Sequence, residues 1–180
     1  HLHRLERRAQ VALEVPSEYR RLSRATHLLG GILSAANLEA TGGSPVDACS
    51  EEPLGFLGPV QVLWWRMLSK ASDALTEAGI PYVYVDSDTP LERLAEYRVI
   101  VTPTYEFASA ERWARLALLA DQGVEVVFGP AVPALDDRMR PHPFPTLSRA
   151  RQVLLDTPED AAQLVETLAS TLGLARPFRV

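Results

Sequence analysis

The 180-residue sequence predicts an α/β fold, with a parallel sheet covered by helices on both faces. Three short runs rich in valine and tyrosine support this prediction, at residues 81–85, 98–102 and 124–128. Segments with helical periodicity separate the runs, and each has a start signal of its own. Strands that alternate with helices in this way are typical of a parallel sheet, because the chain must cross over the sheet between neighbouring strands.

The first strand is expected at residues 11–15, just before Pro16. Ser17 is a suitable N-cap for the helix that follows, and Glu18 lies in its first turn, where an acidic side chain favours the helix dipole. The helical pattern continues through residues 22–33 and is interrupted by a glycine pair, at which we expect a kink or a break.

A long loop is expected at residues 41–59, which are rich in glycine and proline. Loops of this length are usually functional or mobile. The loop carries Cys49, the only cysteine of the sequence. Its acidic neighbours disfavour a thiolate, so we expect an inert thiol and no intramolecular disulfide.

Apolar residues spaced by three and four predict the next helix, from Pro59 to a left-handed cap at Gly79. Trp65 lies beside the apolar stripe of this helix. Because aromatic residues are enriched at interfaces, Trp65 is a candidate anchor for a subunit interface, with packing within the chain as the alternative.

Three further helices are each preceded by a polar residue suited to cap them. The expected caps are Thr89, Ser109 and Thr157. After a proline-rich loop at residues 129–145, residues 152–155 predict a shorter fifth strand.

The connection rules for parallel sheets favour a flavodoxin-like sheet of four or five strands, in the order second, first, third, fourth, fifth. In such sheets ligands bind at the carboxyl ends of the strands, near the point where the first and third strands part. Polar and aromatic residues that follow the predicted strands at this edge are the candidate binding residues. They are Ser17, Glu18, Asp86, Asp88, Thr104, Tyr105 and Glu106.

Sequence motifs for several kinds of chemistry are absent. The sequence has no glycine-rich phosphate loop, no G-x-S-x-G nucleophile turn and no cluster of histidines at metal-ligand spacing. Acidic pairs at residues 51–52 and 136–137 lie in polar loops, where we expect them to be solvated. We therefore expect no catalytic residue, no metal and no cofactor on this chain.

The composition is that of an ordinary globular protein, with 47% hydrophobic and 23% charged residues and a formal net charge of −5. This charge gives no reason to expect binding to nucleic acid or to an anionic membrane. No apolar run is long enough for a membrane span or suited to a signal peptide, so we expect a cytoplasmic protein. The sequence starts without methionine, so we expect it to be either processed or part of a longer chain.

Residues 63–130 carry a family resemblance in three ordered motifs. These are Ala-Gly-Ile-Pro at 78–81, Tyr-Arg-Val-Ile-Val-Thr-Pro at 97–103, and Gly-Val-Glu-Val-Val-Phe at 123–128. In this order they resemble the amidotransferase-like middle domain of family 42 glycoside hydrolases, the bacterial β-galactosidases. The resemblance implies one three-layer domain over residues 1–180, with a fold like that of class I glutamine amidotransferases. The cysteine turn of those amidotransferases is missing, because Gly129 and Pro130 follow the last motif.

In that family the middle domain follows a catalytic barrel and mediates trimer assembly, and the catalytic glutamates belong to the barrel. The resemblance thus implies a non-catalytic trimerisation domain of a β-galactosidase-like parent, with other copies of the chain and the barrel segment as partners. The candidate interface residues are Trp65, Arg20, Arg21 and Arg24. The alternatives are a small-molecule binding or hydrolytic domain that uses the strand edge, and a purely structural module.

Overall fold

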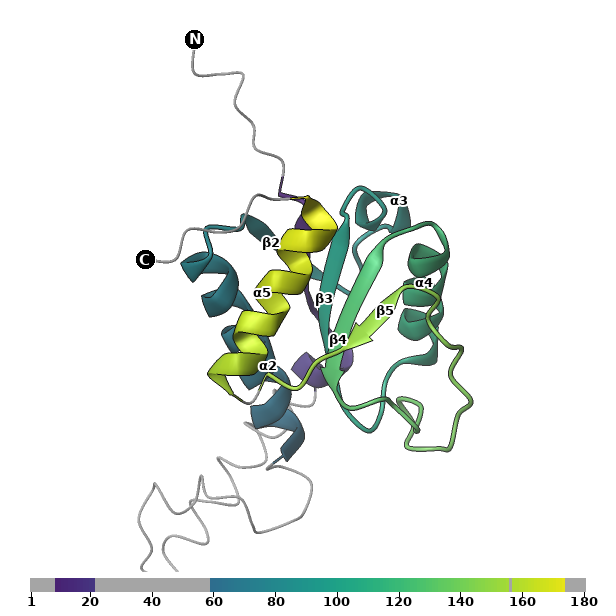
Figure 1. The fold of residues 1–180 in the computed structure, drawn as a ribbon. Helices are drawn as coiled ribbons and strands as arrows, with labels where there is room; N and C mark the ends of the chain where they lie inside the picture. The colour runs from purple at the N-terminus through teal and green to yellow at the C-terminus, as the bar shows by residue number, and fades with distance from the viewer. Residues whose placement is uncertain (1–8, 22–58, 156, 174–180) are drawn as a thin grey trace, which may run out of the picture.

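A computed structural model describes residues 9–21, 59–155 and 157–173. Its centre is a five-stranded sheet, parallel throughout, in the order β2-β1-β3-β4-β5 (Figure 1). The strands are β1 (Val11–Val15), β2 (Tyr82–Asp86), β3 (Val99–Thr104), β4 (Glu125–Pro130) and β5 (Ala150–Gln152). This confirms the predicted α/β class and the flavodoxin-like strand order.

Helices cover both faces of the sheet, which gives three layers (Figure 1). On one face lie α2 (Pro59–Glu77) and α5 (Pro158–Leu172), and on the other lie α3 (Leu91–Leu94) and α4 (Ala110–Asp121). Between β4 and β5 the chain forms an irregular connection instead of a helix. Its side chains Phe144 and Leu147 pack against the α4 side of the core.

The alternation of side chains along each strand divides the core into two clusters. Val11 and Leu13 of β1 face α2 and α5, whereas Ala12 between them faces α4. In β3, Val101 and Ile100 divide in the same way. Because both faces are buried, the strands are almost continuously apolar, and the single charged residue inside β1 therefore requires a partner.

Several predicted helix ends are confirmed. The Ser109 hydroxyl accepts a hydrogen bond from the amide of Arg112, and Thr157 forms a reciprocal capping box with Asp160. Left-handed glycines follow the helices as expected. They are Gly79, Gly123 and Gly173.

Three local predictions are wrong. Thr89 does not cap α3, because its hydroxyl bonds to Asp86 instead. Ser17 does not cap the helix after β1: the carbonyl of Pro16 accepts the first helical bond, and Ser17 is already helical. The fifth strand was predicted at residues 152–155, but β5 ends at Gln152. The chain then turns, and Leu155, at φ 56°, is buried in the core.

Some predictions lie outside the described residues. These are the helix over 22–33, the loop over 41–58 with Cys49, and the position of Arg24. Trp65 is part of α2, but its side chain also lies outside the described part of the structure.

Candidate functional site

The candidate site lies where β1 and β3 end beneath the start of α4. This is the switch point of the flavodoxin-like order, because the chain leaves β1 toward one edge of the sheet and leaves β3 toward the other. At its centre is Arg112, in the first turn of α4, whose side chain is only 3% exposed. The N-cap at Ser109 fixes the start of α4 and so directs Arg112 toward the strand ends.

One end of the Arg112 guanidinium bonds to the two strands. Its Nη1 donates to Glu14 Oε2 at 3.0 Å and to Thr102 Oγ1 at 2.9 Å. The Thr102 hydroxyl in turn donates to the same Glu14 oxygen at 2.6 Å. Three side chains from β1, β3 and α4 therefore close a buried triangle of hydrogen bonds.

The other end of the guanidinium bonds to the helix that follows β1. Arg112 Nε donates to Glu18 Oε1 at 2.7 Å, and the backbone amide of Ser109 donates to the same oxygen at 3.1 Å. We refer to the side chains joined through this guanidinium as the Arg112 cluster. Its members are Glu14, Glu18, Thr102 and Arg112.

Electrostatics stabilise the ionised forms of Arg112 and Glu18. Burial lowers the pKa of Arg112, but the charges of Glu14 and Glu18 outweigh it and raise that pKa above its usual value. Burial raises the pKa of Glu18, yet the guanidinium charge and the backbone hydrogen bonds bring it below the usual value. With two carboxylates around one guanidinium, the cluster has a formal charge of −1.

Two buried atoms of the cluster have no hydrogen-bond partner, Oε2 of Glu18 and Nη2 of Arg112. One is an acceptor and the other a donor, and they belong to side chains already joined through Oε1 and Nε. A single group that both donates and accepts, such as a water molecule, would satisfy both atoms. This is the part of the cluster where an additional polar group fits chemically.

Tyr19 links the helix after β1 to the chain after β3. Its fully buried hydroxyl donates to the Phe107 carbonyl and accepts from the Tyr105 amide at 2.8 Å. Burial is the main reason why the pKa of Tyr19 is raised. Its ring packs edge-on against Phe107, with centroids 5.1 Å apart, and lies 5.9 Å from the Arg112 guanidinium carbon.

The candidate binding residues at the ends of β1 and β2, apart from Glu18, are already bonded within the chain or exposed. The Ser17 amide bonds to the Ser87 hydroxyl at 3.0 Å, which joins the ends of β1 and β2. The carboxylate of Asp86 accepts from the Asp88 amide and from the Thr89 hydroxyl, both at 3.1 Å. Asp88 itself is exposed. The two aspartates thus shape their own turn.

The candidates after β3 are held by the chain that follows β4. The Thr104 side chain is buried and donates to the carbonyl of Ala131, whereas Tyr105 is half-buried and contributes its amide to Tyr19. Glu106 is exposed, and its carbonyl accepts the amides of residues 134 and 135. Of all seven candidates, the structure places only Glu18 in the Arg112 cluster.

Sequence reasoning missed Glu14, Thr102 and Arg112. One signal could have pointed to them: Glu14 is the only charged residue in a strand predicted to be buried on both faces. A charge in such a position needs a bonded partner. No local pattern reveals that partner, because Arg112 follows 98 residues later.

Two searches of the described residues gave negative results. No helix among them is both long and apolar enough to cross a membrane. Likewise, no group of three or more histidine, cysteine, aspartate or glutamate residues in residues 9–21, 59–155 and 157–173 is arranged to hold a metal ion.

Comparison with known proteins found similarity among solved structures only. No family model and no curated protein matches the sequence. A β-galactosidase from Bifidobacterium adolescentis is similar over 96% of this chain, at 18% identity and a TM-score of 0.48. Gan42B, a GH42 β-galactosidase, is similar over 76% of it, at 15% identity and a TM-score of 0.47. The matches span 58% and 15% of the lengths of those two chains.

Proposed function

We propose that this chain is a non-catalytic assembly domain of a β-galactosidase-like glycoside hydrolase, and that it promotes trimer formation of a cytoplasmic parent protein. The motifs at 78–81, 97–103 and 123–128 support the choice of family, because they resemble its middle domain in the same order. The partners in this proposal are other copies of the chain and a catalytic barrel segment of the same parent.

The observation that carries the non-catalytic part of the proposal is the Arg112 cluster. In flavodoxin-like sheets the switch point is where ligands bind. Here buried side chains of the chain itself bond to one another at that point, with Arg112 and Glu14 each 3% exposed. Such a cluster ties β1, β3 and α4 together and supports a structural use of this edge.

Light scattering coupled to size-exclusion chromatography tests the assembly role. We expect a mass above the 19.8 kDa of one chain, which rises with concentration, and no release of nitrophenol from nitrophenyl β-galactoside. Arg20 is half-buried and Arg21 is exposed. Charge reversal at both residues should lower the mass if this helix edge is part of the contact. A strict monomer at every concentration would contradict the proposal, and so would hydrolysis by the chain alone.

A second candidate function is the binding of a small polar molecule at the same edge. The unpartnered Oε2 of Glu18 and Nη2 of Arg112 favour it, because together they can accept and donate. Calorimetric titration with galactose and with glutamine tests this function. Binding that disappears in a Glu18→Gln variant of unchanged fold, in which an amide replaces the carboxylate that carries the unpartnered oxygen, would support it, whereas no heat of binding with either probe would count against it.

A further inference from the structure

Strand β2 forms one edge of the sheet. It is the outermost strand of the sheet beside β1, and within the described residues no other strand pairs with its outer side. The strand contains neither lysine nor proline, the residues that commonly protect an edge against pairing. Its sequence Tyr-Val-Tyr-Val-Asp instead favours strand pairing.

The backbone at the end of β2 indicates which residues face outward. The Asp86 amide bonds to the Thr89 hydroxyl, and the Asp86 carbonyl accepts the Thr89 amide. These groups are therefore used in the turn and not on β1. Because successive residues of a parallel strand direct their backbone groups to opposite sides, Tyr82 and Tyr84 direct theirs outward, as Asp86 does.

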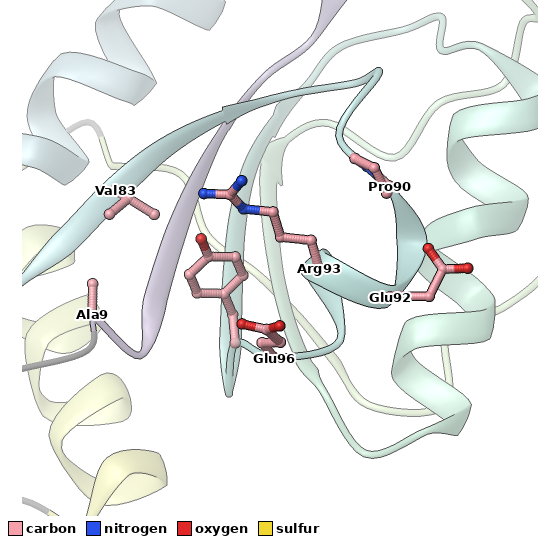
Figure 2. Close-up of a pocket in the computed structure, with 7 residues that line it drawn as sticks. Ala9, Val83, Pro90, Glu92, Arg93 and Glu96 are labelled. Carbon is pink, nitrogen blue, oxygen red and sulfur yellow. The ribbon is translucent and has the colours of Figure 1, made fainter.

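The side chains of β2 present two different surfaces beside this edge. Tyr82 and Tyr84 lie on one face with their rings 5.7 Å apart, and Tyr84 is 54% exposed. Val83 lies on the opposite face, in the wall of a hollow of 520 Å³. Helix α3, only four residues long, forms much of the remaining wall (Figure 2).

The charges beside the hollow are of both signs. Arg93 extends from α3 toward Val83, and Glu92 and Glu96 belong to the same short segment (Figure 2). A surface that carries acidic and basic groups side by side can complement a copy of itself after a two-fold rotation. A purely acidic or purely basic rim would repel its copy.

We propose that two copies of this chain join through their β2 strands, which pair antiparallel about a two-fold axis at Val83. The pattern Tyr-Val-Tyr is the same in both directions about this residue. In this register Tyr82 of each copy lies opposite Tyr84 of the other, as a hydrogen-bonded aromatic pair. The two Val83 residues meet on the axis, and the two α3 segments face each other across it.

This inference goes beyond the proposed function, because an antiparallel pair of identical strands makes a two-fold contact and not a three-fold one. Disulfide trapping tests this contact directly. In a Cys49→Ser background, Val83→Cys places two thiols on the axis, where opposed residues of a non-hydrogen-bonded pair lie close enough for a disulfide. We expect a disulfide-linked dimer under mild oxidation, and loss of most of it when Tyr84→Lys is added.

The control is Val132→Cys in the same background, because Val132 is 56% exposed, which makes it more accessible than the half-buried Val83, but lies after β4. A cross-linking yield at residue 83 no higher than at residue 132, with both variants folded by circular dichroism, would overturn the proposal. Hydrogen exchange of the unmodified chain gives a second measurement. The amides of Tyr82 and Tyr84 should gain protection as concentration rises, and unchanged exchange would overturn the proposal independently.

The two proposals can fail separately. An oligomer that persists without cross-linking at residue 83 would remove the β2 contact and leave the assembly function in place. A cross-linked dimer in a chain whose mass never exceeds two copies would support the β2 contact and count against trimer assembly.

Discussion

Arg112 and Glu14 are 98 positions apart in the sequence, yet their side chains form a 3.0 Å ion pair in the protein interior. Each side chain is only 3% exposed, so bulk solvent hardly reaches either charge. An ion pair in this environment contributes little net stability while intact but is costly to break, because the remaining charge is buried without a partner. Stability should therefore depend strongly on Arg112.

We expect Arg112→Met to lower the free energy of unfolding by about 3–5 kcal/mol, because it leaves the carboxylates of Glu14 and Glu18 without their cation. Urea denaturation followed by circular dichroism measures this change. A triple variant with Glu14→Gln and Glu18→Gln should recover part of the loss, since both uncompensated charges are then removed.

The matched control for this prediction is Arg149→Ala. Arg149 is 54% exposed and lies 3.9 Å from Glu125, so its loss should cost less than about 1 kcal/mol. If Arg112→Met were as mild as this control, the Arg112 cluster would not be the strong link between β1, β3 and α4 that its geometry implies.

Asp136 should make stability depend on pH in the acid range. Its carboxylate accepts bonds from the Arg140 side chain and from the Arg138 and Arg140 amides, which lowers its pKa from 3.8 to about 2. The folded state therefore favours the ionised form. The resulting stabilisation is fully present above pH 3.8 and is lost as the pH falls toward 2.

The test compares the unmodified chain with Asp136→Asn by thermal unfolding at about pH 5 and about pH 2.5. At the higher pH the unmodified chain should be more stable than Asp136→Asn. This difference between the two proteins should shrink at the lower pH. A difference that is constant over this range would mean that the carboxylate charge does not stabilise the turn.

The sequence was sufficient to predict the sheet, because strands buried on both faces must be apolar and separated by crossovers. The predicted run at 98–102 overlaps β3, and the run at 124–128 overlaps β4. By contrast, Thr89 was assigned as a cap from local pattern alone, whereas its hydroxyl bonds to Asp86 at the end of a strand. Local rules cannot decide whether the hydroxyl accepts from an amide of the following helix or bonds to an aspartate at the end of the preceding strand.

The candidate site was predicted only in part for a related reason. Its location follows from the strand order, and Glu18 was identified because it follows β1 directly. Arg112 and Thr102 join Glu14 only through tertiary contacts between β1, β3 and α4. Periodicity shows that a residue is buried but not which distant side chain it contacts. For Glu14 the only indication of a partner in the sequence was a charged residue within a buried strand.

Tyr19→Phe should lower the free energy of unfolding by about 1–3 kcal/mol, because it leaves the Phe107 carbonyl and the Tyr105 amide without their shared hydroxyl. The ring and its contact with Phe107 are retained, so the change isolates the hydroxyl. Urea denaturation provides the measurement. Tyr82→Phe is the control, because its hydroxyl meets Thr76 in an exposed position, and it should change stability by less than about 0.5 kcal/mol.

Gly129→Ala should strongly destabilise the contact between β4 and the chain after β5. A Cβ at this position would lie 1.8 Å from the carbonyl oxygen of Val153 and 2.9 Å from its carbon, so the backbone after β5 would have to move away from β4. We expect a loss of at least about 3 kcal/mol, at the upper end of the cost of overpacking, or an insoluble product.

Gly79→Ala is the matched control. Gly79 has φ +64°, and an added Cβ would have nothing within 4 Å. The cost of this change is therefore limited to about 1–2 kcal/mol of backbone strain. Soluble yield and urea denaturation of both variants measure the difference, and equal losses would show that the contact between residues 129 and 153 is not tight.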